Sequence, residues 1–214
     1  MKFCEMPYTR PDIDETKKSF DSLTERLASA KSYADAKEVF LEEQKLEKHI
    51  DTLVNLVSIR HSVNTRDKFY DEEKNFWNGA MPELQEYMQK WTGAMLATPF
   101  REDFSAEYGD LMFVNAEISL KAFSPEIIPE LQRENELVQE YEKLLASAQI
   151  PFEGGAYTLS QLSPFKTGAD DAQRLAAWKA EGAWYKEHGA EFDGLYDQLV
   201  HLLSLIHISE PTRH

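Results

Sequence analysis

Apolar residues recur at helical rather than strand spacing along most of this chain. Between Asp12 and Ala30 they lie three, four or seven residues apart, which places them on one face of a helix. A second such pattern begins at Ser32, which forms a capping-box motif with Asp35, and extends to Val63. The pattern predicts an all-α protein, mainly helical, with antiparallel helix packing.

The most regular apolar stripe lies near the middle of the chain. Its steps alternate between four and three residues, and it consists of Trp77, Met81, Leu84, Met88, Trp91 and Met95. Packing in a helical core is the favoured interpretation, and a peptide-binding groove is the alternative. Pro82 lies within the stripe, so we expect either a kink there or a new helix with Pro82 in its first turn.

Cap residues divide the segment that follows. Helical spacing covers about residues 100–123, with Gly109 as a candidate break. Ser124 then reads as an N-cap before Pro125, and it opens a helix that we expect to end near Ala148.

The spacing of apolar residues changes from helical to alternating between residues 149 and 160, on either side of a Gly-Gly turn. This segment predicts one small β-hairpin. A helix capped by Asp170 follows, and Gly189 separates it from a last helix.

Composition and charge narrow the function classes. The 214 residues are 42% hydrophobic, and a net charge of -15 disfavours nucleic acid as a partner. The longest uncharged stretch near the C-terminus, residues 198–209, is shorter than the roughly 18 residues that a membrane span needs, so we expect no membrane partner. A single cysteine and the absence of a signal-peptide pattern predict a reduced, cytoplasmic protein.

Catalytic and metal-binding patterns are missing. The histidines, at positions 49, 61, 188, 201, 207 and 214, form no His-x-x-x-His pair, and none follows a glutamate by three residues. The chain also has no glycine-rich phosphate loop and no Gly-x-Ser-x-Gly elbow. The residues themselves therefore predict no catalytic, cofactor-binding or metal-binding site.

Pairs of adjacent carboxylates and the residue His61 could each serve a function or have a purely structural role. Adjacent carboxylates are expected on solvated helix faces in so acidic a chain. His61, beside Arg60, is interpreted as a buried, hydrogen-bonded imidazole rather than a functional contact. The carboxylate pairs in question are Glu42-Glu43, Glu72-Glu73 and Asp170-Asp171.

Several segments resemble the N-terminal half of the oligoendopeptidase F branch of the thimet-oligopeptidase-like zinc metallopeptidases. The likeness covers about residues 1–201 in order. It is carried by residues 1–3 (MKF), 8–12 (YTRPD), 58–65 (SIRHSVNT), 123–127 (FSPEI), 146–150 (ASAQI), 158–162 (TLSQL) and 192–199 (FDGLYDQL).

The resemblance implies a peptidase that hydrolyses peptide bonds in short peptides with zinc-activated water. In this family, a His-Glu-x-x-His helix and a downstream glutamate bind the zinc, and both lie in the C-terminal half. We therefore expect zinc in the intact parent protein, none bound by this chain, and no activity of the chain itself. No catalytic residue of the family can be assigned to a position here.

The last residues differ from the family. Residues 202–214 (LLSLIHISEPTRH) resemble a translated sequencing adapter. We therefore expect residues 1–201 to be a truncated, family-like region and 202–214 to be a non-native tail. The alternative to a peptidase fragment is a complete acidic helical adaptor that binds a partner through the stripe from Trp77 to Met95.

Overall fold

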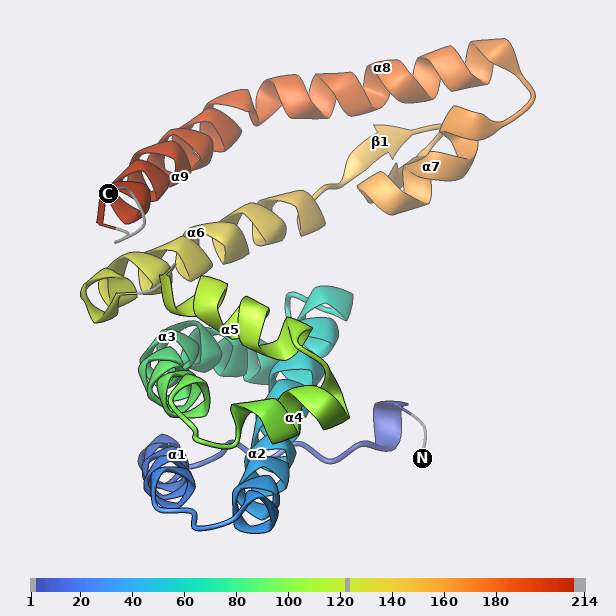
Figure 1. The fold of residues 1–214 in the computed structure, drawn as a ribbon. Coiled ribbons are helices and arrows are strands. Elements are labelled where there is room, and N and C mark those ends of the chain that lie inside the picture. The colour runs from blue at the N-terminus through green and yellow to red at the C-terminus, as the bar shows by residue number, and fades with distance from the viewer. Residues whose placement is uncertain (1–2, 122–123, 210–214) are drawn as a thin grey trace. The chain divides into compact units, whose positions relative to one another are not determined.

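The computed structural model describes residues 3–121 and 124–209 (Figure 1). The chain divides into two compact units, one of residues 1–132 with 206–214 and one of residues 133–205. The described residues form helices and one two-stranded sheet, which confirms the all-α prediction with a small hairpin. Within these described ranges, no helix combines the length and the apolar character that crossing a membrane requires.

The first unit opens with a short 3-10 helix, η1 (Phe3–Glu5), and two long helices, α1 (Ile13–Ala28) and α2 (Tyr33–Val63). The Asp12 carboxylate accepts a hydrogen bond from the backbone N–H of Glu15, and the Ser32 hydroxyl accepts one from that of Asp35. Because these caps satisfy N–H groups that have no partner inside the helix, they fix both predicted starts.

The third helix, α3 (Lys68–Leu96), continues through Pro82. A new helix start at Pro82 is therefore wrong. A proline inside a helix removes one backbone hydrogen bond and crowds the carbonyl groups of the preceding turn. Here the side-chain amide of Gln132 donates a 2.8 Å hydrogen bond to the Gly79 carbonyl, which gives that turn an added partner.

The apolar stripe of α3 lies in the core of the first unit, as predicted. Trp77 is 3% exposed and Trp91 is 6% exposed, so neither indole forms an open groove. One core cluster contains Phe20, Ile50, Leu53, Val57, Trp77, Ala80 and Leu84. A second contains Leu23, Leu27, Ala36, Val39, Phe40, Trp91, Met95, Phe104 and Phe113.

Gly109 separates α4 (Arg101–Tyr108) from α5 (Leu111–Lys121), which confirms the predicted break. Its φ of 88° is readily adopted only by glycine. The predicted helix end at Phe123 lies outside the described residues. Ser124 then caps a 3-10 turn, η2 (Pro125–Ile127), which leads into α6 (Ile128–Ala146).

The second unit contains the hairpin, in which β1 (Ile150–Phe152) pairs antiparallel with β2 (Gly155–Tyr157). The hairpin is followed by two helices, α7 (Leu159–Thr167) and α8 (Asp171–Glu187). These two helices pack against each other and against the hairpin. This unit has its own core cluster, which contains Ala148, Ile150, Phe152, Leu162, Ala177 and Trp184.

The last helix, α9 (Gly189–Ser209), runs without a break across Leu202. It therefore includes the first residues of the segment predicted to be a foreign tail, whereas residues 210–214 lie outside the described residues. The boundary between residues 201 and 202 stays a prediction.

Candidate functional site

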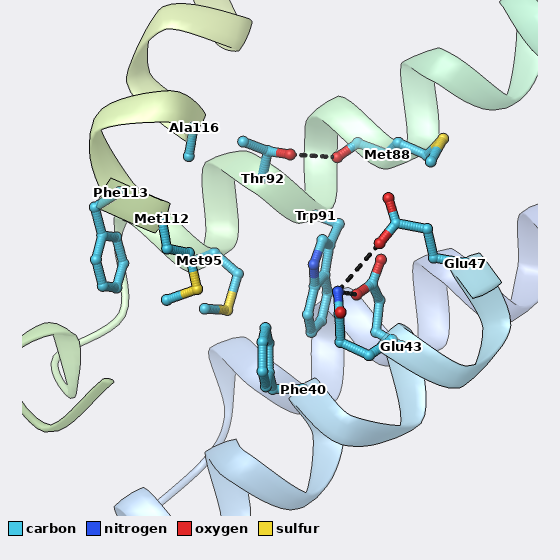
Figure 2. Close-up of a pocket in the computed structure, with 11 residues that line it drawn as sticks. Phe40, Glu43, Glu47, Met88, Trp91, Thr92, Met95, Met112, Phe113 and Ala116 are labelled. Carbon is cyan, nitrogen blue, oxygen red and sulfur yellow. Dashed lines mark hydrogen bonds between the residues drawn. The ribbon is translucent and has the colours of Figure 1, made fainter. Parts of the chain in front are cut away.

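A cavity of about 280 Å³ lies in the first unit among α2, α3 and α5 (Figure 2). Helix α2 contributes positions three and four residues apart, so their side chains share one helix face. Most of the wall is aromatic or thioether in character. The lining residues are Phe40, Glu43, Gln44, Glu47, Met88, Trp91, Thr92, Met95, Met112, Phe113 and Ala116. We call this cavity the Glu43 pocket.

Two carboxylates lie at the α2 side of the Glu43 pocket. Glu43 is only 2% exposed, and the side-chain amide of Gln44 donates 3.1 Å hydrogen bonds to both Glu43 and Glu47 (Figure 2). Burial raises the pKa of Glu43 to about 7, and burial together with the charge of Asp51 raises the pKa of Glu47. Lys, Arg and His are absent from the described residues that line the pocket.

The expectation that Glu42 and Glu43 both lie on a solvated face is wrong for Glu43. Glu42 is half-exposed and pairs with Arg26, whereas Glu43 points into the core between apolar positions of α2. A signal was present in the sequence, because Glu43 lies seven residues after Ala36 and seven before Ile50, both of which are buried.

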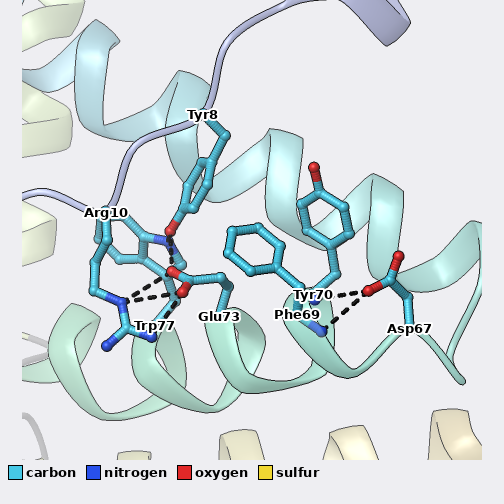
Figure 3. A network of polar contacts seen from close by, with 7 residues as sticks. All are labelled: Tyr8, Arg10, Asp67, Phe69, Tyr70, Glu73 and Trp77. Carbon is cyan, nitrogen blue, oxygen red and sulfur yellow. Dashed lines mark hydrogen bonds and ion pairs between the residues drawn. The ribbon is translucent and has the colours of Figure 1, made fainter.

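The expectation that Glu72 and Glu73 both lie on a solvated face is likewise wrong for Glu73. It is 4% exposed, and Arg10 donates to both of its carboxylate oxygens at 2.7 to 3.1 Å (Figure 3). Tyr8 donates a 2.5 Å hydrogen bond to the same carboxylate, and Trp77 donates to the Tyr8 oxygen at 3.1 Å. The signal was the position of Glu73 one helical turn before Trp77 on the α3 stripe.

The network around Glu73 attaches the N-terminal segment to α3. Burial alone would raise the pKa of Glu73, but the hydrogen bonds from Arg10 and Tyr8 outweigh burial and lower it. Burial and the bond to Glu73 raise the pKa of Tyr8. Since every group has a partner and the Arg10 guanidinium also stacks on the Phe76 ring, the network is structural.

The remaining sequence expectations concern polar residues. His61 is 1% exposed and its Nε2 lies 3.3 Å from an Asp71 carboxylate oxygen, which confirms a buried, hydrogen-bonded imidazole. Asp170 and Asp171 are both exposed, as expected. Asp170 caps α8 by accepting from the N–H groups of Ala172 and Gln173.

The described residues do not fit a zinc ion. Within residues 3–121 and 124–209, no three His, Cys, Asp or Glu side chains converge as metal ligands would. The Glu43 pocket supplies two carboxylates on one helix and no imidazole. His207 and His214 lie where no side chain is described.

Comparison with known proteins identifies the fold. Residues 3–123 match the family model of the Peptidase M3 N-terminal domain. A structure assigned as oligoendopeptidase F from Bacillus anthracis str. Ames is 39% identical over 100% of this chain, with a TM-score of 0.95. A second oligoendopeptidase F structure is 38% identical over 96% of the chain, with a TM-score of 0.92.

A structure of PZ peptidase A with an inhibitor is 36% identical over 96% of the chain, with a TM-score of 0.91. The chain spans 36% to 39% of the length of these relatives. No curated protein matches it significantly.

These likenesses show that the chain is a helical region of a peptidase. The chain belongs to the M3 peptidase family, and it resembles the N-terminal part of oligoendopeptidase F. The resemblance noted in the sequence is thereby confirmed.

Proposed function

We propose that this chain is the N-terminal region of a cytoplasmic, zinc-dependent oligoendopeptidase, which hydrolyses peptide bonds in short peptides with metal-activated water. The observation that carries the proposal is the likeness to oligoendopeptidase F structures, at 38% and 39% identity over nearly the whole chain. Identity at this level over a matching fold supports a shared function for the whole protein, whereas fold likeness alone would not.

The chain itself is proposed to be inactive. Because its described residues bring together no ligand set for zinc, the ligands of the parent enzyme belong to the part of the relatives that this chain does not span. We also propose that residues 1–201 are the family-like region and that 202–214 are foreign to it, on the basis of the sequence of that segment.

An assay of the purified chain tests the proposed inactivity. The chain is incubated with zinc and a fluorogenic peptide, with and without a chelator, beside an intact oligoendopeptidase F as positive control. We expect hydrolysis by the control alone. Hydrolysis by the chain that the chelator abolishes would contradict the proposal.

The source gene tests the proposed parent enzyme. Amplification outward from inside the gene reads the DNA beyond the codon for Leu202. A frame that continues into His-Glu-x-x-His with a downstream glutamate supports the peptidase and the foreign tail together. A genomic stop codon after His214 would contradict both.

The alternative of a complete adaptor needed an exposed stripe from Trp77 to Met95. Trp77, Leu84, Trp91 and Met95 are all buried in the two core clusters of the first unit. These four residues therefore form no exposed surface for a partner protein, and the structure gives the adaptor no support.

A further inference from the structure

The Glu43 pocket combines aromatic and acidic side chains. The α3 wall carries the Trp91 indole, and the α2 wall carries the Phe40 ring together with Glu43 and Glu47 (Figure 2). Aromatic faces and carboxylates both attract cations, and a Trp face is the strongest aromatic partner. The pocket is thus complementary to a positive charge on an apolar body.

Among the residues that the structure describes, Glu43 has no cationic partner that would account for a buried carboxylate. Among the described residues that line the pocket, the neutral amide of Gln44 is the side chain that donates to it, and Gln44 shares its amide with Glu47. Buried charges in proteins are usually paired or bound to a cation. The other core carboxylate of this unit, on Glu73, follows that rule through Arg10.

We propose that the Glu43 pocket binds a small organic ammonium ion with an apolar or aromatic body. The ammonium group lies between Glu43 and Glu47, where the Gln44 amide now lies, and the apolar body contacts Trp91, Met88 and Met95. This site is separate from the zinc chemistry of the proposed enzyme, so either proposal can fail without the other.

The volume of the pocket sets the size of a suitable probe. A water molecule occupies about 30 Å³ of liquid, so about 280 Å³ holds about nine groups of that size. Phenethylamine, a phenyl ring on a short alkylammonium chain, matches that size. Its neutral counterpart, 2-phenylethanol, keeps the ring and chain but lacks the charge.

Isothermal titration calorimetry of the full chain at about pH 8, above the pKa of Glu43, compares the two probes. We expect phenethylamine to bind with a Kd of about 1 mM or tighter and at least about tenfold more tightly than 2-phenylethanol. Absence of amine binding, or equal binding of amine and alcohol, would overturn the proposal.

Variants tie the binding to the pocket. Glu43→Gln keeps the shape and removes the charge, so we expect at least about a tenfold loss of amine affinity with little change for the alcohol. Glu38→Gln, an exposed position on the same helix, is the matched control and should bind like the unmodified chain. Amine affinity that is unchanged in Glu43→Gln would refute the assigned site.

A second variant fills the pocket without a change of charge, so that the test does not depend on Glu43→Gln alone. Ala116→Met adds a side chain at the α5 wall without any change of charge, and we expect it to weaken both probes. Thermal unfolding of each variant confirms that the fold is retained. If Ala116→Met is folded and binds phenethylamine normally, the probe lies elsewhere and the proposal is wrong.

An ammonium group can belong to a free amine or to the N-terminus of a peptide, and the same titration separates these sources. The dipeptide Phe-Gly carries the phenyl ring and the ammonium on a peptide. Tighter binding of Phe-Gly than of phenethylamine assigns the ligand to peptides, and the reverse order assigns it to free amines. Failure of both to bind would overturn the proposal.

Discussion

Glu43 makes the stability of the first unit depend on pH. Because burial raises its pKa from 4.5 to about 7, the folded chain retains a proton in this range that the unfolded chain loses. The contribution of Glu43 to stability therefore falls as pH rises through this range. We expect Glu43→Gln, which has no charge to bury, to be more stable at about pH 8 by up to about 3 kcal/mol.

Urea unfolding at about pH 8 and at about pH 4 measures the difference. The gain should disappear at the lower pH, where both states of the unmodified chain are protonated. Glu38→Gln, which changes an exposed carboxylate of the same helix, should stay within about 0.5 kcal/mol at both values. A Glu43→Gln chain no more stable than this control at the higher pH would show that folding does not raise the pKa of Glu43.

At the scale of single residues, periodicity predicted burial better than residue type did. Glu43 and Glu73 were assigned to solvent because they are carboxylates, yet both occupy apolar-face positions of their helices. Their neighbours Glu42 and Glu72 lie off that face and are less buried. The partner of Glu73 could not be predicted, because Arg10 is 63 residues away in the chain.

Helix α7 depends on the caps at its start. The Thr158 hydroxyl accepts from the N–H of Gln161 at 3.2 Å, and the Gln161 side chain accepts from the N–H of Thr158 at 3.0 Å. We expect Thr158→Ala to destabilise this helix by about 1 kcal/mol, since the N–H of Gln161 loses its acceptor. Hydrogen exchange of residues 158–167 should then speed up by about fivefold.

Ser160→Ala provides the control, because Ser160 is exposed on the first turn of α7 and takes no part in the capping box. It should leave the exchange of residues 158–167 nearly unchanged. Equal acceleration in both variants would mean that the hydroxyl of Thr158 does not cap the helix.

At the scale of elements, cap residues predicted most helix boundaries, because a cap acts on backbone groups only two or three residues away. Ser32 and Asp170, both predicted as caps, begin helices as expected, and Asp12, where the apolar pattern was predicted to start, caps α1. No helix was predicted between the hairpin and Asp170, so α7 was missed, although the Thr158 and Gln161 spacing of a capping box was present.

The two compact units have separate hydrophobic cores. Leu84 lies in a core cluster of the first unit and Leu162 in the cluster of the second, and both are 0% exposed. We expect either residue, changed to Ala, to destabilise its own unit by about 2 to 5 kcal/mol. Hydrogen exchange should lose protection mainly within residues 13–121 for Leu84→Ala and within 148–188 for Leu162→Ala.

Each of these variants serves as the control for the other, because the deleted groups are the same. Loss of protection across both units in either variant would show that the whole chain unfolds as one cooperative unit.

The sequence by itself determined the helical class, most of the helix boundaries, the hairpin and the family. These properties follow from local backbone caps, from the helical spacing of apolar residues and from stretches of family-like sequence. The tertiary structure decided which carboxylates are buried, that α3 continues through Pro82 and that α2, α3 and α5 enclose the Glu43 pocket. Each of these depends on side chains from distant segments, because burial and cavities arise only when separate helices pack together.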